Sequence, residues 1–418
     1  MKTIQKCSAY KIKNSRGEET IEVEMSAGDF SATASVPSGK SRGSKEAVAL
    51  PANEAIKNVN EIIAPKIIGK ETDVFEIDKF LLELDGTENK SNLGANAVLG
   101  VSIATLKLSA KLAGEPLWQH IQSLSSRSTQ SRNFPHLFAN VLNGGAHGEF
   151  NLPFQEYMLV LGNGSSVVEP FKQLQVLFEK LGEILREKYD AVPMGDEGGY
   201  SPKIAGAGIK GIEEPFEILN HLGLGAPSKS LGAWSPKWAV DAAASGFYKN
   251  AYYEILDQKY SSDELLEIYK NLVRKFPITG LEDPFAENDF EAFTSLTKKM
   301  KNLGTRCLSG EVLVVGDDLT TTNSKMIKKA VLEKSINAVI IKPNQIGTVS
   351  ETLEAVKIAR EAGLKIIVSH RSGETMDSFI ADLAVGVGAY GIKAGAPSQP
   401  ERTAKYERLL EIEKEMKK

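Results

Sequence analysis

Six ionisable side chains stand at intervals along the second half of the chain, each at the end of a short apolar run. They are Asp241, Glu282, Asp317, Lys342, His370 and Lys393, and 23 to 41 residues separate each from the next. The run "AVII" before Lys342 is typical of a buried strand, which a charge rarely closes. Either this lysine reaches water along its own aliphatic stem, or it points into a site and takes part in chemistry.

Three of these six residues are carboxylates, and their spacing indicates that they follow neighbouring strands. Like charges at close range repel one another unless a cation neutralises them. Oxygen ligands with room for water suit Mg²⁺ better than zinc. Each acid could instead cap the helix after its strand, but three acids followed by a lysine and a histidine favour one shared site.

Strands and helices alternate after about residue 135, which predicts the scaffold for these side chains. The strand-like runs are "KWAVDAAA", "ITGLEDPF", "VLVVGDD", "INAVIIKP", "KIIVSH" and "VGAYGIKAG", and amphipathic segments such as "SDELLEIYKNLVRKF" separate them. So many βα units predict a parallel sheet closed into a barrel, with an open doubly wound sheet as the alternative. The carboxyl ends of barrel strands all face one mouth, where active sites lie.

The first part of the chain has a different pattern. Residues 20–26 and 30–36 resemble antiparallel strands, and residues 44–68 and 94–114 have the periodicity of helices. Strands followed by helices predict an α+β unit. The stretch "SLSSRSTQSRN" is rich in serine and predicts a linker. We therefore expect a cap over 1–122, a linker over 123–134 and a catalytic barrel over 135–418.

Composition limits the kinds of protein this could be. The 418 residues are 42% hydrophobic and 25% charged, as in ordinary globular chains, and the net charge is −4. A pI near 5.9 argues against a dedicated nucleic-acid binder. Cys7 and Cys307 alone cannot build a disulfide framework or a zinc site. The chain has no signal-like start, and its most apolar stretch, 97–106, is too short to cross a membrane, so we expect a cytoplasmic protein.

Two glycine-rich stretches carry further candidates. "GDEGGYSP" at 195–202 is either an ordinary turn or a loop whose glycines let Glu197 project into a site. "NGGAHGEFNLPFQEYM" at 143–158 places His147 and Glu156 around a similar turn. "GAGIKG" at 206–211 fits a dinucleotide-binding pattern but follows no strand, so we reject that interpretation.

Taken together, these motifs resemble the enolase family nearly from end to end. The matching stretches, in the family's order, are "NSRGEETIEVEM", "VPSG" with Ser41, "NGGAH", "QEYM", "GDEGG", "EDPFAENDF", "GDDLTTTN", "IKPNQIG", "SHRSGET", "IKAGAP" and "ERTAKYERLLEIE". The resemblance implies a small α+β cap followed by a modified (β/α)8 barrel. It also implies a homodimer or a ring of dimers.

The resemblance implies a function and a role for each site residue. The reaction is the reversible dehydration of 2-phosphoglycerate to phosphoenolpyruvate, with two Mg²⁺ ions, one of them dependent on substrate. Asp241, Glu282 and Asp317 would hold the first ion and Ser41 the second. Lys342 would be the general base and Glu197 the general acid, with Glu156 sharing the proton. The residues around the substrate would be His147, Gln155, Glu156, Glu282, Asp317, Lys342, Ser369, His370, Arg371, Ser372 and Lys393, with His147 and His370 also catalytic.

The proposed base carries an electrostatic requirement. Lys342 must be neutral to accept a proton, and we expect nearby Mg²⁺ and Lys393 to depress its pKa. Arg371 and Ser372 offer the fork and hydroxyl donors that suit a phosphate.

The sequence departs from the family pattern in three places. "SGKSRG" stands where the family commonly has "SGASTG", so Lys40 and Arg42 add two cations that could bind phosphate or repel Mg²⁺. Gly246 stands where a glutamate is usual in the family. The stretch "CLSGEVLVVGDD" is a few residues longer than its counterpart, so Glu311 is a rival ligand if the strand ends earlier, although "GDDLTTTN" favours Asp317. The alternatives are a paralogue acting on another carboxylate and a non-catalytic binding protein on the same scaffold.

Overall fold

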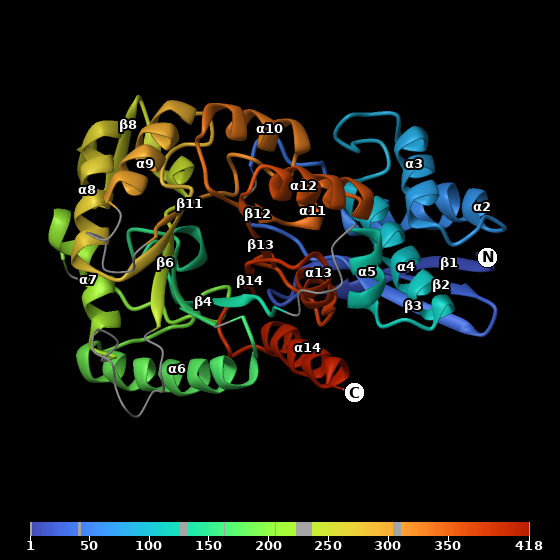
Figure 1. Cartoon of the computed structure of the whole chain (residues 1–418), viewed down its shortest axis with the longest axis horizontal. Helices are drawn as coiled ribbons and strands as arrows, with labels where there is room; N and C mark the ends of the chain where they lie inside the picture. The colour runs from blue at the N-terminus through green and yellow to red at the C-terminus, as the bar shows by residue number, and fades with distance from the viewer. Residues whose placement is uncertain are drawn as a thin grey trace.

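The computed structural model describes residues 2–40, 43–125, 133–162, 164–204, 206–222, 236–303 and 311–417. Its two parts are a small antiparallel sheet with its own helices, at the right of Figure 1, and a closed eight-stranded barrel ringed by helices. This α/β arrangement, a cap followed by a modified (β/α)8 barrel, confirms the predicted fold class.

The cap is built on an amphipathic sheet. Strands β1 (Lys6–Lys13), β2 (Glu19–Ala27) and β3 (Phe30–Ser35) are antiparallel and lie in that order. Alternate residues of β2, Ile21, Val23 and Met25, are fully buried, because successive side chains of a strand point to opposite faces. Their buried face packs against helix α4 (Ala95–Ala113), which confirms the helix predicted over 94–114.

The remaining cap helices show one error of prediction. They are α1 (Ala52–Lys57), the π-helical turn η1 (Asn58–Ile63), α2 (Ala64–Ile67), α3 (Val74–Asp85) and α5 (Leu117–Leu124). The helix expected from residue 44 begins only at Ala52. Pro51 disfavours helical backbone just before it, and the Ala47 N–H donates to the Gln345 carbonyl of the barrel at 2.8 Å.

Eight strands close the barrel in the order β10-β11-β12-β13-β14-β4-β5-β6. Their bounds are β4 (His136–Asn143), β5 (Glu156–Leu161), β6 (Lys237–Asp241), β10 (Ile278–Glu282), β11 (Leu313–Gly316), β12 (Ala338–Ile341), β13 (Lys365–Ser369) and β14 (Gly391–Lys393). Seven strands are parallel, and β5 runs antiparallel to both of its neighbours. The sheet is therefore a closed barrel and not the open alternative.

Helices accompany the barrel strands, and most of them cover the outside of the barrel. They are α6 (Val168–Lys188), α7 (Gly208–Asn220), α8 (Ser262–Lys275), α9 (Phe290–Leu303), α10 (Ser324–Glu333), α11 (Pro343–Ile346), α12 (Val349–Glu361), α13 (Phe379–Val387) and α14 (Pro400–Met416). Helix α8 begins with a capping box in which Ser261 and Glu264 each bond the other's backbone N–H. Short elements lie in the connections between barrel strands: η2 (Gly145–His147), η3 (Ala244–Phe247), β7 (Tyr248–Lys249), β8 (Tyr252–Ile255) and β9 (Gln258–Tyr260). The last three form a separate antiparallel sheet in the order β7-β8-β9.

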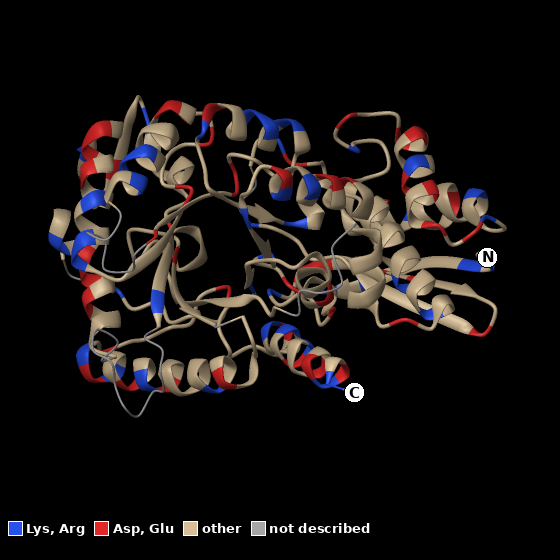
Figure 2. Ribbon diagram, in the orientation of Figure 1, with Lys and Arg blue, Asp and Glu red and all other residues tan. Residues whose placement is uncertain are grey.

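The outer helices carry mixed charges, as expected for helices with one face in water. Basic and acidic residues are interspersed along the outer helices in Figure 2. Among the described residues no single helix has the length and hydropathy to cross a membrane. Within the same residues, α4 and α5 meet both criteria only when they are taken together, and they are bent by 104°.

The last helix, α14, ties down the loop that follows β13. Lys405 of α14 lies 2.6 Å from a Glu374 carboxylate oxygen, and its ammonium also donates to the Thr375 carbonyl. Both charged side chains are almost fully buried, at 0% and 3% exposed. Water therefore cannot replace either partner of this ion pair.

We predict that Lys405→Met lowers the free energy of unfolding by about 3–5 kcal/mol, because it leaves a buried carboxylate without its cation. Urea denaturation followed by circular dichroism measures this. Lys414→Met, at an exposed position of the same helix, should change the stability by less than about 0.5 kcal/mol. A double variant that combines Lys405→Met with Glu374→Leu should recover most of the lost stability. Equal losses of stability in Lys405→Met and Lys414→Met would contradict the prediction.

Candidate active site

The six ionisable residues meet at one mouth of the barrel, as the sequence predicts. Asp241, Glu282 and Lys393 end β6, β10 and β14, while Asp317, Lys342 and His370 directly follow β11, β12 and β13. Lys342 is 13% exposed, and the other five are buried. The pocket at this mouth is lined by Glu46, His147, Gln155, Glu156, Glu197, Asp241, Ala243, Asp283, Asp317, Asp318, Lys342, Ser369, His370, Arg371, Ser372 and Lys393.

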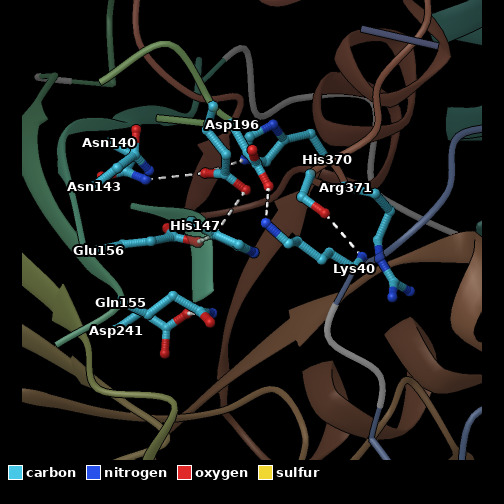
Figure 3. Close-up of polar contacts among 12 residues, drawn as sticks. Lys40, Asn140, Asn143, His147, Gln155, Glu156, Asp196, Asp241, His370 and Arg371 are labelled. Carbon is cyan, nitrogen blue, oxygen red and sulfur yellow. Dashed lines mark hydrogen bonds and ion pairs between the residues drawn. The ribbon is translucent and has the colours of Figure 1, made fainter. Parts of the chain in front are cut away.

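The reversed strand β5 brings a further acid to the same mouth. Because β5 is antiparallel, its first residue, Glu156, reaches the mouth and pairs in register with Asp241 of β6. Gln155, just before it, donates to an Asp241 carboxylate oxygen at 3.3 Å, and the two lie side by side in Figure 3. His147 arrives from η2, in the connection between β4 and β5.

Lys393 is the cation at the centre of the acids. Its ammonium lies 2.9 Å from Glu156, 2.9 Å from Glu282 and 3.5 Å from Asp241. Burial disfavours the ammonium, but these acids outweigh burial and raise the pKa of Lys393 well above its usual range. Lys393 therefore stays charged and holds three strands of the barrel together.

Lys342 forms a short ion pair with Asp317, whose other oxygen accepts from Gln345 at 2.9 Å. Burial lowers the pKa of Lys342, but the Asp317 charge raises it more, and the net pKa lies above the ordinary value. Lys393 lowers the pKa of Lys342, as expected, but the Asp317 charge outweighs this effect. The lowering expected from Mg²⁺ stays a prediction.

The remaining carboxylates are crowded, which bears on whether they could hold a metal. Burial and neighbouring acids raise the pKa of Asp241 to about 6 and that of Glu282 well above its usual range, against the opposing effect of Lys393. In contrast, Lys342 outweighs burial and lowers the pKa of Asp317 to about 2. Oxygen donors that repel one another in this way form a set that a hard divalent cation would stabilise.

Within the described residues, two groups have ligand atoms within 4.8 Å of one another. They are Asp283, Asp317 and Asp318, and His147, Glu156 and Glu197. The predicted trio of Asp241, Glu282 and Asp317 is not such a group, and a lysine ammonium lies against each of these three acids. The sequence reasoning missed Asp283 as a site residue, although it directly follows Glu282. Its carboxylate accepts the N–H groups of Asp317 and Asp318, at 3.1 and 2.6 Å, and so fixes the turn after β11.

Glu197, another acid of the pocket, lies between two histidines. His147 Nδ1 lies 3.5 Å from one of its oxygens, and His370 Nε2 lies 3.3 Å from the other, which also accepts from Asn140 at 3.0 Å. Burial raises the pKa of Glu197, but the histidines and Arg402 lower it well below the usual range. The sequence reasoning missed Asn140, although a buried asparagine inside the apolar strand β4 is an available signal.

The two histidines differ in their surroundings. Burial lowers the pKa of His147, but Glu197 and Glu156 outweigh it and raise the pKa above its ordinary value. Burial lowers the pKa of His370, and Arg402 adds to that effect, so this imidazole is the more readily neutral of the two. Glu156 keeps a lowered pKa because Lys393 and His147 outweigh burial.

The loop after β13 and the serine-containing loop of the cap lie against each other. Ser38 and Gly373 exchange two backbone hydrogen bonds at 2.8 Å, and the Lys40 N–H donates to the Ser372 hydroxyl at 2.9 Å. Arg371 donates to both oxygens of Glu46, at 2.9 and 3.3 Å. The sequence reasoning missed Glu46 because it lay within a segment predicted to be helical.

The departures from the family pattern have different outcomes. Lys40 reaches across to Asp196 of the "GDEGG" loop at 3.0 Å, as Figure 3 shows, whereas Ser41 and Arg42 lie outside the described residues. Glu311 is exposed and precedes β11, at the end of that strand away from the mouth, so it does not rival Asp317. Gly246 lies in η3, and a side chain there would meet open space.

Comparisons with known proteins agree with this geometry. The family model described as "Enolase, N-terminal domain" matches residues 4–121, and "Enolase, C-terminal TIM barrel domain" matches residues 131–418. The chain is 42% identical to the enolase of Thermococcus gammatolerans, over 98% of this chain and 94% of that protein. It is 42% identical to the enolase of Methanopyrus kandleri, over 100% and 96%, and to that of Ureaplasma parvum, over 98% and 95%. The chain belongs to the enolase family.

Proposed function

We propose that this chain catalyses the reversible dehydration of 2-phosphoglycerate to phosphoenolpyruvate, a step of glycolysis and gluconeogenesis. The observation that supports this most is a single pocket in which Lys342 lies on Asp317 while Glu197 lies between two histidines. Groups with opposite tasks in proton transfer need different surroundings. A lysine base that works with Mg²⁺ is itself a known pattern of enolase-superfamily sites.

We assign the first Mg²⁺ to Asp241, Glu282 and Asp317, and the second, which depends on substrate, to Ser41. The oxygen donors and the raised pKa values of Asp241 and Glu282 support this assignment. When bound, Mg²⁺ neutralises the charge that builds on the substrate carboxylate as the proton leaves C2. Lys393, already on two of these acids, adds a fixed positive charge to the same half of the pocket.

Lys342 is the proposed general base. It must release its own proton before it can accept the one at C2. Its ion pair with Asp317 works against this release. Asp317 would stabilise the lysine's charge less strongly once it also served as a ligand of Mg²⁺. Binding of the ion would therefore also lower the pKa of Lys342 and favour its role as a base.

Glu197 is the proposed general acid for the departing hydroxide. Its low pKa in the substrate-free pocket means that it must gain a proton before elimination. The phosphate and carboxylate of the substrate bring negative charge into the pocket, and such charge raises the pKa of a nearby carboxyl. His147 touches both Glu197 and Glu156, so the proton can be shared among these three groups.

The substrate's anionic groups would be held by Arg371, Ser372 and Lys393, with Gln155, Ser369 and His370 completing the wall of the pocket. Arg371 presents a planar fork that matches a phosphate as well as it matches the Glu46 carboxylate. A bound phosphate would therefore take the place of Glu46 on this guanidinium.

Further parts of the proposal concern the whole protein. We propose a cap over 1–122, a linker over 123–134 and a barrel over 135–418, assembled as a cytoplasmic homodimer or higher homo-oligomer. The domain bounds follow from the change of pattern along the sequence, and the oligomer follows from the family resemblance. The serine-rich composition of 123–133 also supports the linker.

The division of labour between base and acid can be tested by isotope exchange. We predict that Lys342→Ala removes exchange of the C2 proton and lowers turnover about 10³-fold or more, because a positioned base is lost. Glu197→Gln should spare the exchange while blocking elimination, as followed by NMR and by phosphoenolpyruvate absorbance. Lys66→Ala, exposed on α2, is the control. Loss of exchange in Glu197→Gln would refute the assignment.

Removal of divalent cations should abolish turnover. We predict that dialysis against a chelator eliminates activity and that added Mg²⁺ restores it, because the crowded acids then regain their counter-charge. Asp241→Asn should require about tenfold more Mg²⁺ for half-maximal activity, because a charged ligand is lost. Glu83→Gln, exposed on α3, should keep the original requirement. Full activity in chelator would be the contrary result.

The Lys40–Asp196 ion pair should contribute little to catalysis. Its lysine is 47% exposed, and such pairs contribute at most about 1 kcal/mol, so Lys40→Ala should change kcat/KM by less than about sixfold. Asp196→Asn should have a similar effect, and the double variant should add little more. A much larger loss confined to Lys40→Ala would indicate that this ammonium contacts the substrate instead.

A further inference from the structure

Arg402 of α14 is a fully buried cation that the proposed reaction does not use. Its side chain is 0% exposed and runs toward the barrel mouth, where it meets two loops. It donates to the Arg371 carbonyl at 2.6 Å and to the Ser372 carbonyl at 2.6 Å. It also donates to the Asp196 carbonyl at 3.2 Å, so one guanidinium joins the loop after β13 to the "GDEGG" loop.

The same guanidinium also contacts an imidazole. Arg402 Nη1 lies 2.5 Å from His370 Nδ1. An arginine carries only donors and does not lose its proton in proteins, so His370 Nδ1 must accept this hydrogen bond. The imidazole proton of a neutral His370 must then be on Nε2, which lies 3.3 Å from a Glu197 oxygen.

We propose that Arg402 is a positioning residue that fixes the Nε2–H tautomer of His370 and thereby holds Glu197 for elimination. This inference rests on the proposed function. Nε2 lies 3.3 Å from the Glu197 oxygen and is buried without another hydrogen-bond partner among the described residues, so an N–H that turns toward this oxygen would stabilise the carboxylate left when Glu197 gives up its proton. In the other tautomer, an imidazole lone pair would face a carboxylate oxygen, which repels it.

Packing leaves no freedom for another arrangement. Gly395 has a φ of +81°, and a Cβ there would lie 2.9 Å from Arg402 Cδ, 2.9 Å from the Glu197 carbonyl oxygen and 3.1 Å from His370 Cε1. Only glycine fits a site of this conformation and closeness. Tyr406, one turn along α14, donates to the Gly395 carbonyl at 2.7 Å and fixes the helix relative to this turn.

The tautomer can be measured in the unmodified protein. Nitrogen-15 NMR of histidine-labelled enzyme without substrate should show His370 neutral, with its proton on Nε2. The chain has five histidines, and His370→Gln identifies the signal. A proton on Nδ1 would overturn the proposal even if the enzyme performs the proposed reaction. Absence of that reaction in an enzyme with the expected tautomer would instead count against the proposed function.

Variants test whether the guanidinium is the cause. In Arg402→Ala we expect His370 to lose its single tautomer and elimination to fall about 10²-fold or more, as for loss of acid catalysis. Exchange of the C2 proton by Lys342 should persist, which a general loss of structure would not allow. Added guanidinium should restore both the tautomer and part of the elimination rate.

Arg408→Ala is the matched control on the same helix. Arg408 bonds Asp382 at 2.9 Å and Glu415 at 2.7 Å, away from the two loops, so its removal tests loss of stability without loss of positioning. We expect an unchanged His370 tautomer and an unchanged rate of elimination in this variant. A folded Arg402→Ala that keeps the Nε2–H tautomer, or one that loses exchange and elimination equally, would overturn the proposal.

Discussion

The organisation of this protein depends on how buried negative charges are neutralised. Glu156, Asp241, Glu282 and Asp317 lie at one mouth of a barrel, where water cannot screen their repulsion. Lys393 and Lys342 lie directly on these acids and make their burial tolerable. The strands that carry these charges are otherwise mostly apolar. The pocket is polarised before any ligand arrives, which is the condition for electrostatic catalysis.

The parts that could be predicted from sequence are those with strong periodicity or distinctive charge placement. A strand such as β12, with four apolar residues before Lys342, can be identified from the sequence because its short length and β-branched residues favour a strand over a helix. The alternation of strands and helices predicts a closed barrel. In such a barrel the residues at the carboxyl ends of the strands converge at one mouth. Glu311 could not be eliminated from sequence, since the exact start of β11 decides which end of the strand it occupies.

Other features could not be predicted because they depend on contacts far apart in the chain. Glu46 lies in a segment with helical periodicity, yet Pro51 and the contacts of Glu46 with Arg371 oppose helix formation there, and the helix begins only at Ala52. The pKa of Lys342 depends on whether its nearest neighbour is a cation or the Asp317 carboxylate, which spacing alone does not reveal. The environment of His370 is likewise set by Arg402 on a helix some thirty residues later. In each case tertiary context outweighs local pattern.

The backbone bridge between Ser38 and Gly373 has a consequence for biosynthesis. These partners lie far apart in the sequence, so the segment before Ser41 cannot find its neighbour until most of the chain has left the ribosome. The cap sheet can collapse early on its own local contacts, but the rim of the site is sealed only by the last segments made. In an incomplete chain the acids at the barrel mouth would lack their lysine partners and remain exposed. The chain would therefore become catalytically competent only at the end of synthesis.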